Sequence, residues 1–170
     1  MAAIPQTPLS FEQFIQLYGG KSRCEYWGGT VIEKPMGTTF HGVLQILIGK
    51  LLLDAGFVPA SEVTLRIVSG FYPKPDIIAF RDIAGIDAYP TRAPDLIVEI
   101  LSEGNSMRYM LDKCQRYTDW GCPEVYVVDL AAHNIYHWVP AQGLHLSQEL
   151  AGISAVRIWQ ELAAILNRQQ

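Results

Sequence analysis

The spacing of apolar residues along the chain predicts four helices. Ser10, with Gln13 three positions later, has the pattern of a capping box at the start of the first one. Glycines follow the first three segments and are expected to end them, because glycine accepts the backbone geometry of a helix C-terminus. The stretches with helical spacing are residues 10–18, 39–54, 106–120 and, more weakly, 157–166.

Segments with strand character lie between these helices. Gly28 and Gly29 separate two short strand-like runs, which is the strongest hairpin signal in the chain. Residues 58–68 alternate roughly with period two and predict a strand before a turn at residues 69–73. The next two runs, residues 76–80 and 95–101, are almost continuously apolar. Such runs are typical of strands that are covered on both faces. The remaining predicted strands are residues 24–27, 30–34, 76–80, 95–101, 124–130 and 135–139.

This order of elements predicts one mixed sheet flanked by helices, in an α/β (α+β) fold. The 170 residues are 49% hydrophobic, which is enough for one buried core, so we expect a single domain over residues 1–170. The start of the chain lacks a secretory pattern, and no stretch approaches the roughly 18 apolar residues of a membrane span. Three cysteines without a CxxC spacing indicate reduced thiols, and together these features predict a cytoplasmic protein.

Two acidic residues stand in unusually apolar surroundings. Strand alternation places Glu99 on the same face as Ile97 and Leu101, and Asp76 opens another apolar strand. A buried carboxylate needs a cation, a metal or several hydrogen-bond donors, because its desolvation is costly. Asp76 alone could be a turn residue after Pro75, and the two acids together could belong to a structural ion pair.

A pair of carboxylates on adjacent strands offers the hard oxygen ligands that suit Mg²⁺ or Mn²⁺. Such a cation, with phosphate oxygens as further ligands, would support hydrolysis of a phosphodiester bond. Lys113 lies on the helix after the Glu99 strand, at the border of its apolar stripe, and could stabilise charge that develops in the transition state. The alternative for Lys113 is an ordinary solvated position.

The chain here resembles the Uma family of putative restriction endonucleases, a branch of the PD-(D/E)XK nuclease superfamily. The motifs that carry the resemblance are CEYWGG at 24–29, KPDII at 74–78, PDLIVEILS at 94–102, Lys113 with Tyr117, and GCPEVYVVD at 121–129. The resemblance implies a restriction-endonuclease-like fold with Asp76 and Glu99 as metal ligands. It also implies a further ligand in the backbone carbonyl of Ile100.

The chain departs from the family pattern at two positions. Leu101 stands where the superfamily has a lysine, so the resemblance assigns that role to Lys113 on the next helix. Tyr109 stands where relatives tend to have an acidic residue one turn before this lysine. Both departures concern the lysine and its surroundings, and they leave the pair of predicted metal ligands, Asp76 and Glu99, intact.

Two further residues are site candidates. Glu25 matches an acidic family position and could approach the metal or position a water, although a cross-strand salt bridge is an alternative. His41 could act as a general base, although a lone helical histidine is more often a packing or surface residue.

The leading hypothesis is a Mg²⁺- or Mn²⁺-dependent DNA endonuclease, and the alternative is a non-catalytic domain on the same fold that binds nucleic acid or protein. The net charge of −4 gives no bulk attraction for DNA, although bound cations would offset part of it. Cleavage of both strands of a duplex is commonly served by two-fold symmetry, so we expect a homodimer.

Overall fold

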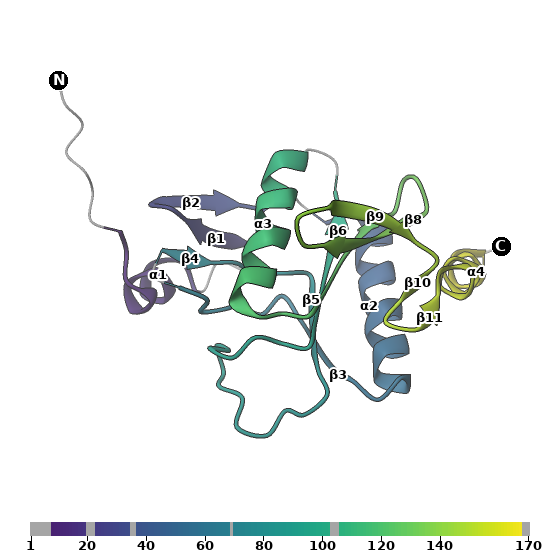
Figure 1. The fold of residues 1–170 in the computed structure, drawn as a ribbon, viewed down its shortest axis with the longest axis horizontal. Coiled ribbons are helices and arrows are strands. Elements are labelled where there is room, and N and C mark those ends of the chain that lie inside the picture. The colour runs from purple at the N-terminus through teal and green to yellow at the C-terminus, as the bar shows by residue number, and fades with distance from the viewer. Residues whose placement is uncertain (1–7, 20–22, 35–36, 69, 103–105, 168–170) are drawn as a thin grey trace.

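A six-stranded mixed sheet forms the centre of the protein (Figure 1). The computed structural model describes residues 8–19, 23–34, 37–68, 70–102 and 106–167. Within the sheet, β6 and β7 are parallel and all other neighbours are antiparallel. In spatial order the strands are β3 (Val58–Ser61), β5 (Ile77–Phe80), β6 (Leu96–Leu101), β7 (Glu124–Asp129), β8 (Asn134–Val139) and β9 (Gly143–Ser147).

Helices cover both faces of this sheet, as the apolar runs predict (Figure 1). The crossover helix α3 (Met107–Trp120) packs on one face, while α2 (Thr39–Asp54) and α4 (Ala155–Leu166) pack on the other. Neighbouring residues of one strand enter different cores: Val98 joins the α2 and α4 side, whereas Ile97 joins the α3 side. The alternation of side chains therefore sends Glu99 to the face covered by α3.

A second sheet stands beside the first and carries the N-terminal part of the chain. Its order is β2 (Thr30–Glu33), β1 (Cys24–Trp27) and β4 (Phe71–Tyr72), and α1 (Phe11–Tyr18) packs against it through a separate aromatic core. Gly28 and Gly29 form the predicted hairpin turn, and both have the positive φ that a tight turn of this kind requires. The hairpin brings β1 next to the central sheet and to α3 (Figure 1).

The predicted strand over residues 58–68 is wrong beyond residue 61. β3 ends at Ser61, and Glu62 has a φ of +56°, which breaks the extended backbone. Leu65 and Arg66 then donate their N–H groups to the carbonyls of Pro73 and Pro90, which belong to loops, so no strand partner is available. The predicted turn at residues 69–73 is also wrong in part, because residues 71 and 72 form β4.

The other predicted elements are confirmed with small shifts at their ends. The last helix begins at Ala155, two residues before the predicted start, and the strands after residue 139 were not predicted. A small two-stranded sheet of β10 (Glu149–Leu150) and β11 (Ile153–Ser154) precedes α4. The three cysteines are free and buried. Within the described residues, no helix has both the length and the apolarity to cross a membrane.

The predicted capping box is present at α1. The Ser10 hydroxyl accepts a hydrogen bond from the N–H of Gln13, whose side chain accepts one from the N–H of Ser10. We expect Ser10→Ala to lower the free energy of unfolding by about 1 kcal/mol, the usual loss for a cap residue, in urea titrations.

Ser154→Ala is the matched control for this prediction. Ser154 is the N-cap of α4 and is also exposed, but its side chain makes no capping hydrogen bond. It should therefore leave the unfolding midpoint almost unchanged. Equal losses in the two variants would contradict the assigned role of the Ser10 hydroxyl.

Candidate active site

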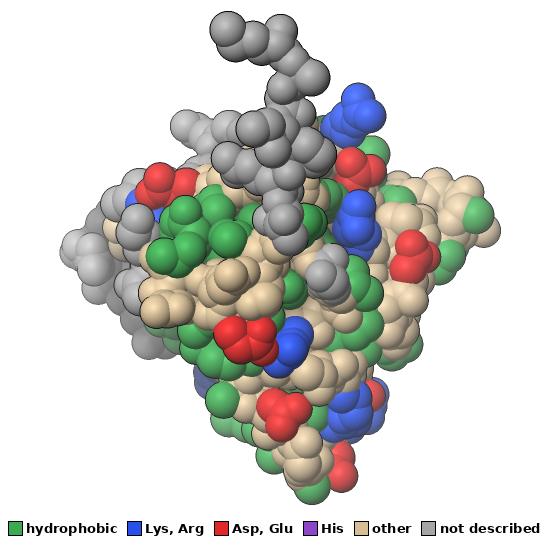
Figure 2. Space-filling model, turned by 90° about the vertical axis from the view of Figure 1, so that its left-hand side faces the viewer, with side chains coloured by type: hydrophobic (Ala, Val, Ile, Leu, Met, Phe, Trp, Pro, Cys, Tyr) green, Lys and Arg blue, Asp and Glu red, His purple; other side chains and the backbone are tan. Residues whose placement is uncertain are grey.

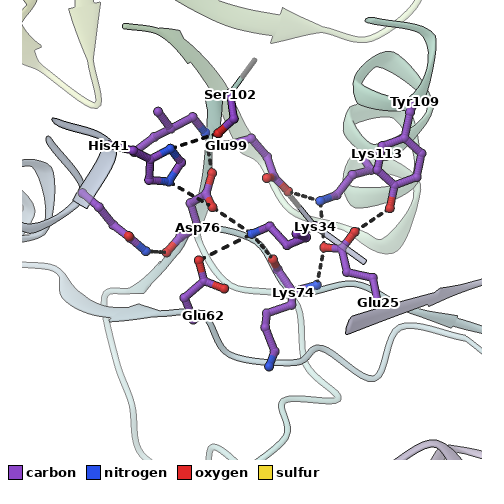
Figure 3. A network of polar contacts seen from close by, with 12 residues as sticks. Glu25, Lys34, His41, Glu62, Lys74, Asp76, Glu99, Ser102, Tyr109 and Lys113 are labelled. Carbon is purple, nitrogen blue, oxygen red and sulfur yellow. Dashed lines mark hydrogen bonds and ion pairs between the residues drawn. The ribbon is translucent and has the colours of Figure 1, made fainter. Parts of the chain in front are cut away.

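A cavity of about 410 Å³ opens where the two sheets meet. Its walls come from β1, the end of β2, the first turns of α2, the adjoining ends of β5 and β6, and α3. The polar side chains at this junction form one continuous network, shown in Figure 3. Its members that line the cavity are Glu25, Lys34, His41, Glu62, Asp76, Glu99, Ser102, Tyr109 and Lys113.

Asp76 is buried just before the first residue of β5, and both of its carboxylate oxygens have partners. Oδ2 accepts a hydrogen bond of 2.6 Å from the backbone N–H of Ile100, and Oδ1 lies 2.8 Å from Nζ of Lys34. The β5–β6 register pairs Ile77 with Val98, so Asp76 and Glu99 follow as the next facing positions. The two acids predicted from the sequence are therefore brought together.

Glu99 forms an ion pair with a buried lysine from α3. The Lys113 ammonium lies 2.6 Å from Oε1 of Glu99, and the Tyr117 hydroxyl donates to the same oxygen at 2.7 Å. Both Glu99 and Lys113 are only 2% exposed. Lys113 is thus not a solvated residue, because its whole side chain is enclosed and its charge is compensated inside the protein.

The same ammonium holds Glu25 on β1. Oε1 of Glu25 is 2.9 Å from Nζ of Lys113 and accepts a hydrogen bond of 2.7 Å from the backbone N–H of Lys74. The hydroxyl of Tyr109 donates to the other oxygen. The predicted cross-strand salt bridge is wrong: Glu25 faces the apolar Ile32 across the hairpin, and its cation comes from α3.

His41 reaches the site from the first turn of α2. Thr38 caps this helix, and its hydroxyl accepts the N–H of His41. The imidazole Nε2 lies 3.5 Å from Oδ1 of Asp76, and Nδ1 lies 3.2 Å from the hydroxyl of Ser102. His41 is therefore buried at the site and not on the surface, and both ring nitrogens contact the polar network. Its role as a general base stays a prediction.

Lys34 was not identified from the sequence, yet it lies at the centre of the network. Its ammonium contacts Asp76, the carbonyl of Lys74 at 2.9 Å and, at 3.5 Å, the carboxylate of Glu62. The only available signal was its position at the end of the predicted hairpin. Neither Lys34 nor Glu62 interrupts an apolar run, so hydrophobic spacing gives no indication of either.

Burial opposes ionisation of each acid here, and the neighbours determine the outcome. For Asp76, contacts with His41 and Lys34 outweigh burial and lower its pKa below the usual range. For Glu25, the charges of Lys113 and Lys34 likewise outweigh burial and lower the pKa. For Glu99, burial dominates over the charge of Lys113, and the neighbouring carboxylates add to it, so its pKa is raised. As the pH falls, Glu99 therefore takes up a proton at a higher pH than Asp76 or Glu25 does.

The donor set fits a hard divalent cation in its chemistry. Asp76 and Glu99 supply carboxylate oxygens beside one cavity, and Mg²⁺ commonly takes only one or two protein carboxylates while it keeps several waters. Among the described residues no group of three or more histidine, cysteine or acidic side chains is arranged as a metal site. The carboxylates instead contact the chain's own ammonium groups. The assignment of Ile100 as a carbonyl ligand stays a prediction.

The comparisons with known proteins identify the family and the fold. The family model Uma2, described as "Putative restriction endonuclease", matches residues 11–163. The crystal structure of a putative nuclease belonging to DUF820 from Anabaena variabilis ATCC 29413 superposes with a TM-score of 0.74, covering 91% of this chain and 99% of that chain. At 18% sequence identity, this superposition establishes a shared fold alone. The comparison with curated proteins found no match.

The shared ammonium makes Lys113 a major determinant of stability. We expect Lys113→Met to lower the free energy of unfolding by about 3–5 kcal/mol, because it leaves Glu25 and Glu99 buried without their cation. Denaturant titrations in EDTA measure this loss. The double variant Lys113→Met/Glu99→Gln should recover part of it, because it removes one of the uncompensated charges.

Lys50→Met is the control, since Lys50 pairs with Asp54 on the exposed face of α2 and should contribute little. A Lys113→Met protein as stable as the wild type would show that the buried charges do not depend on this ammonium.

The lowered pKa of Asp76 predicts a pH dependence. An acid with a lowered pKa stabilises the fold above its unfolded pKa of about 4, and this contribution is lost as the pH falls through the folded pKa. Asp76→Asn should therefore be less stable than the wild type by about 2 kcal/mol at pH 5–7, and the difference should shrink below pH 4.

Urea titrations between pH 7 and pH 3 in EDTA test this window. Asp112→Asn, an exposed position on α3, should follow the wild-type curve throughout. A deficit in Asp76→Asn that is constant down to pH 3 would contradict a lowered pKa at this carboxyl.

Proposed function

We propose that this chain, which belongs to the Uma2 family of putative restriction endonucleases, is a divalent-cation-dependent endonuclease that hydrolyses phosphodiester bonds in DNA. The observation that supports the proposal most directly is the pair of buried acids, Asp76 and Glu99, at facing positions beside a cavity between the two sheets. Mg²⁺ or Mn²⁺ is the expected cofactor, because these ions prefer carboxylate oxygens. Bound there, the cation would polarise the scissile phosphate and activate a water.

The residues around the acids have separable tasks in this proposal. Lys113 holds Glu25 and Glu99 in place, because its ammonium lies within 3 Å of both carboxylates and its side chain is buried. Its charge also contributes positive potential to the cavity wall. Direct contact between Lys113 and a phosphate would require it to leave one of these acids.

His41 is proposed to orient Asp76, since its Nε2 faces Oδ1 of that residue and its Nδ1 contacts Ser102. Proton transfer by His41 to or from the reacting water stays a prediction. Glu25 is proposed to act through Lys113, because both of its carboxylate oxygens are bound by donors of the chain.

The surface beside the N-terminal sheet gives no sign of strong electrostatic attraction for DNA. On the face shown in Figure 2, acidic and basic side chains of the described residues are interspersed, without a broad basic area. This agrees with the net charge of −4. We therefore expect weak binding of the isolated chain to DNA, strengthened by the divalent cation at the site. The expected homodimer stays a prediction.

A non-catalytic domain that binds nucleic acid or protein is the second candidate. The observation that favours it is that each acid already has partners: the described side chains provide ammonium or hydroxyl groups to Asp76, Glu99 and Glu25. Such pairing would preserve the fold without any cation.

Cleavage assays distinguish the two candidates. We expect Mn²⁺- or Mg²⁺-dependent nicking of supercoiled DNA by the purified chain, and a loss of more than about 100-fold in Asp76→Ala and Glu99→Ala, because each removes a proposed ligand. Asp112→Asn should retain wild-type activity.

Substrates should include single-stranded, double-stranded and branched DNA, and calorimetry with Mn²⁺ should accompany them. Binding of Mn²⁺ without cleavage of any substrate would favour the non-catalytic domain. Absence of Mn²⁺ binding would overturn the proposed cation site itself.

A further inference from the structure

Lys34 occupies the position at which a ligand of Asp76 would have to bind. It follows β2 and reaches the central sheet from the hairpin, where three oxygens surround its ammonium (Figure 3). These are Oδ1 of Asp76 at 2.8 Å, the carbonyl of Lys74 at 2.9 Å and Oε1 of Glu62 at 3.5 Å. Two carboxylates and a backbone carbonyl are also the kinds of ligand that a hard cation uses.

Asp76 has no carboxylate oxygen without a donor. Oδ2 accepts the backbone N–H of Ile100, which the strand fixes in position, and Oδ1 faces Lys34 with His41 at the longer distance of 3.5 Å. Oδ1 is therefore the oxygen of Asp76 at which a divalent cation can replace a side-chain donor. The ammonium of Lys34 and such a cation carry charges of the same sign, so the two cannot share that oxygen closely.

Lys34 can leave its position, whereas Lys113 cannot do so easily. The Lys113 side chain is 2% exposed and bridges two buried acids, so its departure would strand both of them. The Lys34 side chain is 15% exposed and lines the open cavity, and its partner Glu62 is on the surface. Only a rotation of its flexible stem is needed to bring the ammonium into water.

We propose that Lys34 is an internal substitute for the divalent cation: its ammonium neutralises Asp76 in the cation-free protein and is displaced when the cation binds. This inference rests on the proposed function, since it concerns the same site. It assigns to Lys34 a positioning role that sets the affinity for the cation. It also gives the buried carboxylate of Asp76 a positive partner whenever no cation is bound.

The proposal has opposite consequences for affinity and stability. Without the ammonium, the cation no longer competes for Oδ1, and the fraction of protein that is ready to bind rises, so the apparent dissociation constant falls. The cation-free protein loses the partner of a buried carboxylate and becomes less stable. Mn²⁺ should therefore raise the melting temperature more in the variant than in the wild type.

The experiment compares Lys34→Met, Lys34→Gln and Lys34→Arg with the wild type by calorimetric titration with MnCl₂ and by thermal melting in EDTA and in MnCl₂. We expect Lys34→Met and Lys34→Gln to bind Mn²⁺ at least about 10-fold more tightly than the wild type. A tenfold rise in the fraction of protein that is competent to bind would lower the apparent dissociation constant by this factor. Lys34→Arg, which keeps the charge, should bind like the wild type. Lys50→Met, an exposed lysine on α2, controls for the change in net charge.

The outcomes separate this inference from the proposed function. Equal or weaker Mn²⁺ binding by both neutral variants, with binding by the wild type intact, would overturn the role of Lys34 and leave the cation site standing. Absence of binding by every protein would overturn both. If Lys34→Met folds only when Mn²⁺ is present, the proposal is supported. If it does not fold at all, the comparison of Lys34→Gln with Lys34→Arg decides in the same way.

Discussion

One buried ammonium joins the parts of this protein. Lys113, on the helix that crosses from β6 to β7, lies between Glu99 of the central sheet and Glu25 of the hairpin sheet. A lone charge at such depth would cost a large part of a typical protein's net stability, so each of the three side chains depends on the other two. Tyr109 and Tyr117 supply the remaining hydrogen bonds. The arrangement ties three elements together and fixes the cavity between the sheets.

The same contacts stabilise the fold and position the residues of the candidate site, so a substitution that breaks one of them affects both. The segment before β5 illustrates this: the N–H of Lys74 binds Glu25, its carbonyl binds Lys34, and the next residue but one is Asp76. Pro75 between them has no N–H that would need a partner in this buried stretch. The acids are thus held from both sides by backbone and side-chain donors. The chain's own lysines neutralise these buried acids, and under the proposal made above Lys34 thereby competes with a metal for an oxygen of Asp76.

The sequence predicts the framework well and the network only in part. Asp76 and Glu99 are recognisable because a carboxylate in an apolar run needs an explanation, and Lys113 because it borders an apolar helical stripe and matches a family motif. Lys34 and Glu62 are not recognisable in this way, because they lie at the ends of exposed elements and meet the site only through the hairpin's tertiary position. Residues 63–68 mislead for the opposite reason: their alternation is real, but the backbone N–H groups of Leu65 and Arg66 are bound by loop carbonyls.

The position of Lys113 on a helix rather than on a strand has a structural consequence. Leu101 follows Glu99 by two residues on the same face of β6 and packs into the α3 core, where a lysine would have to bury its stem among apolar side chains. A lysine there would reach Glu99 along the strand and would have no means of holding the hairpin. From α3, the ammonium instead contacts Glu99 and Glu25 together. From the helix, the ammonium therefore lies beside Glu99 and also links the two sheets, which is why Glu25 of the hairpin and Lys113 of the helix belong to one unit.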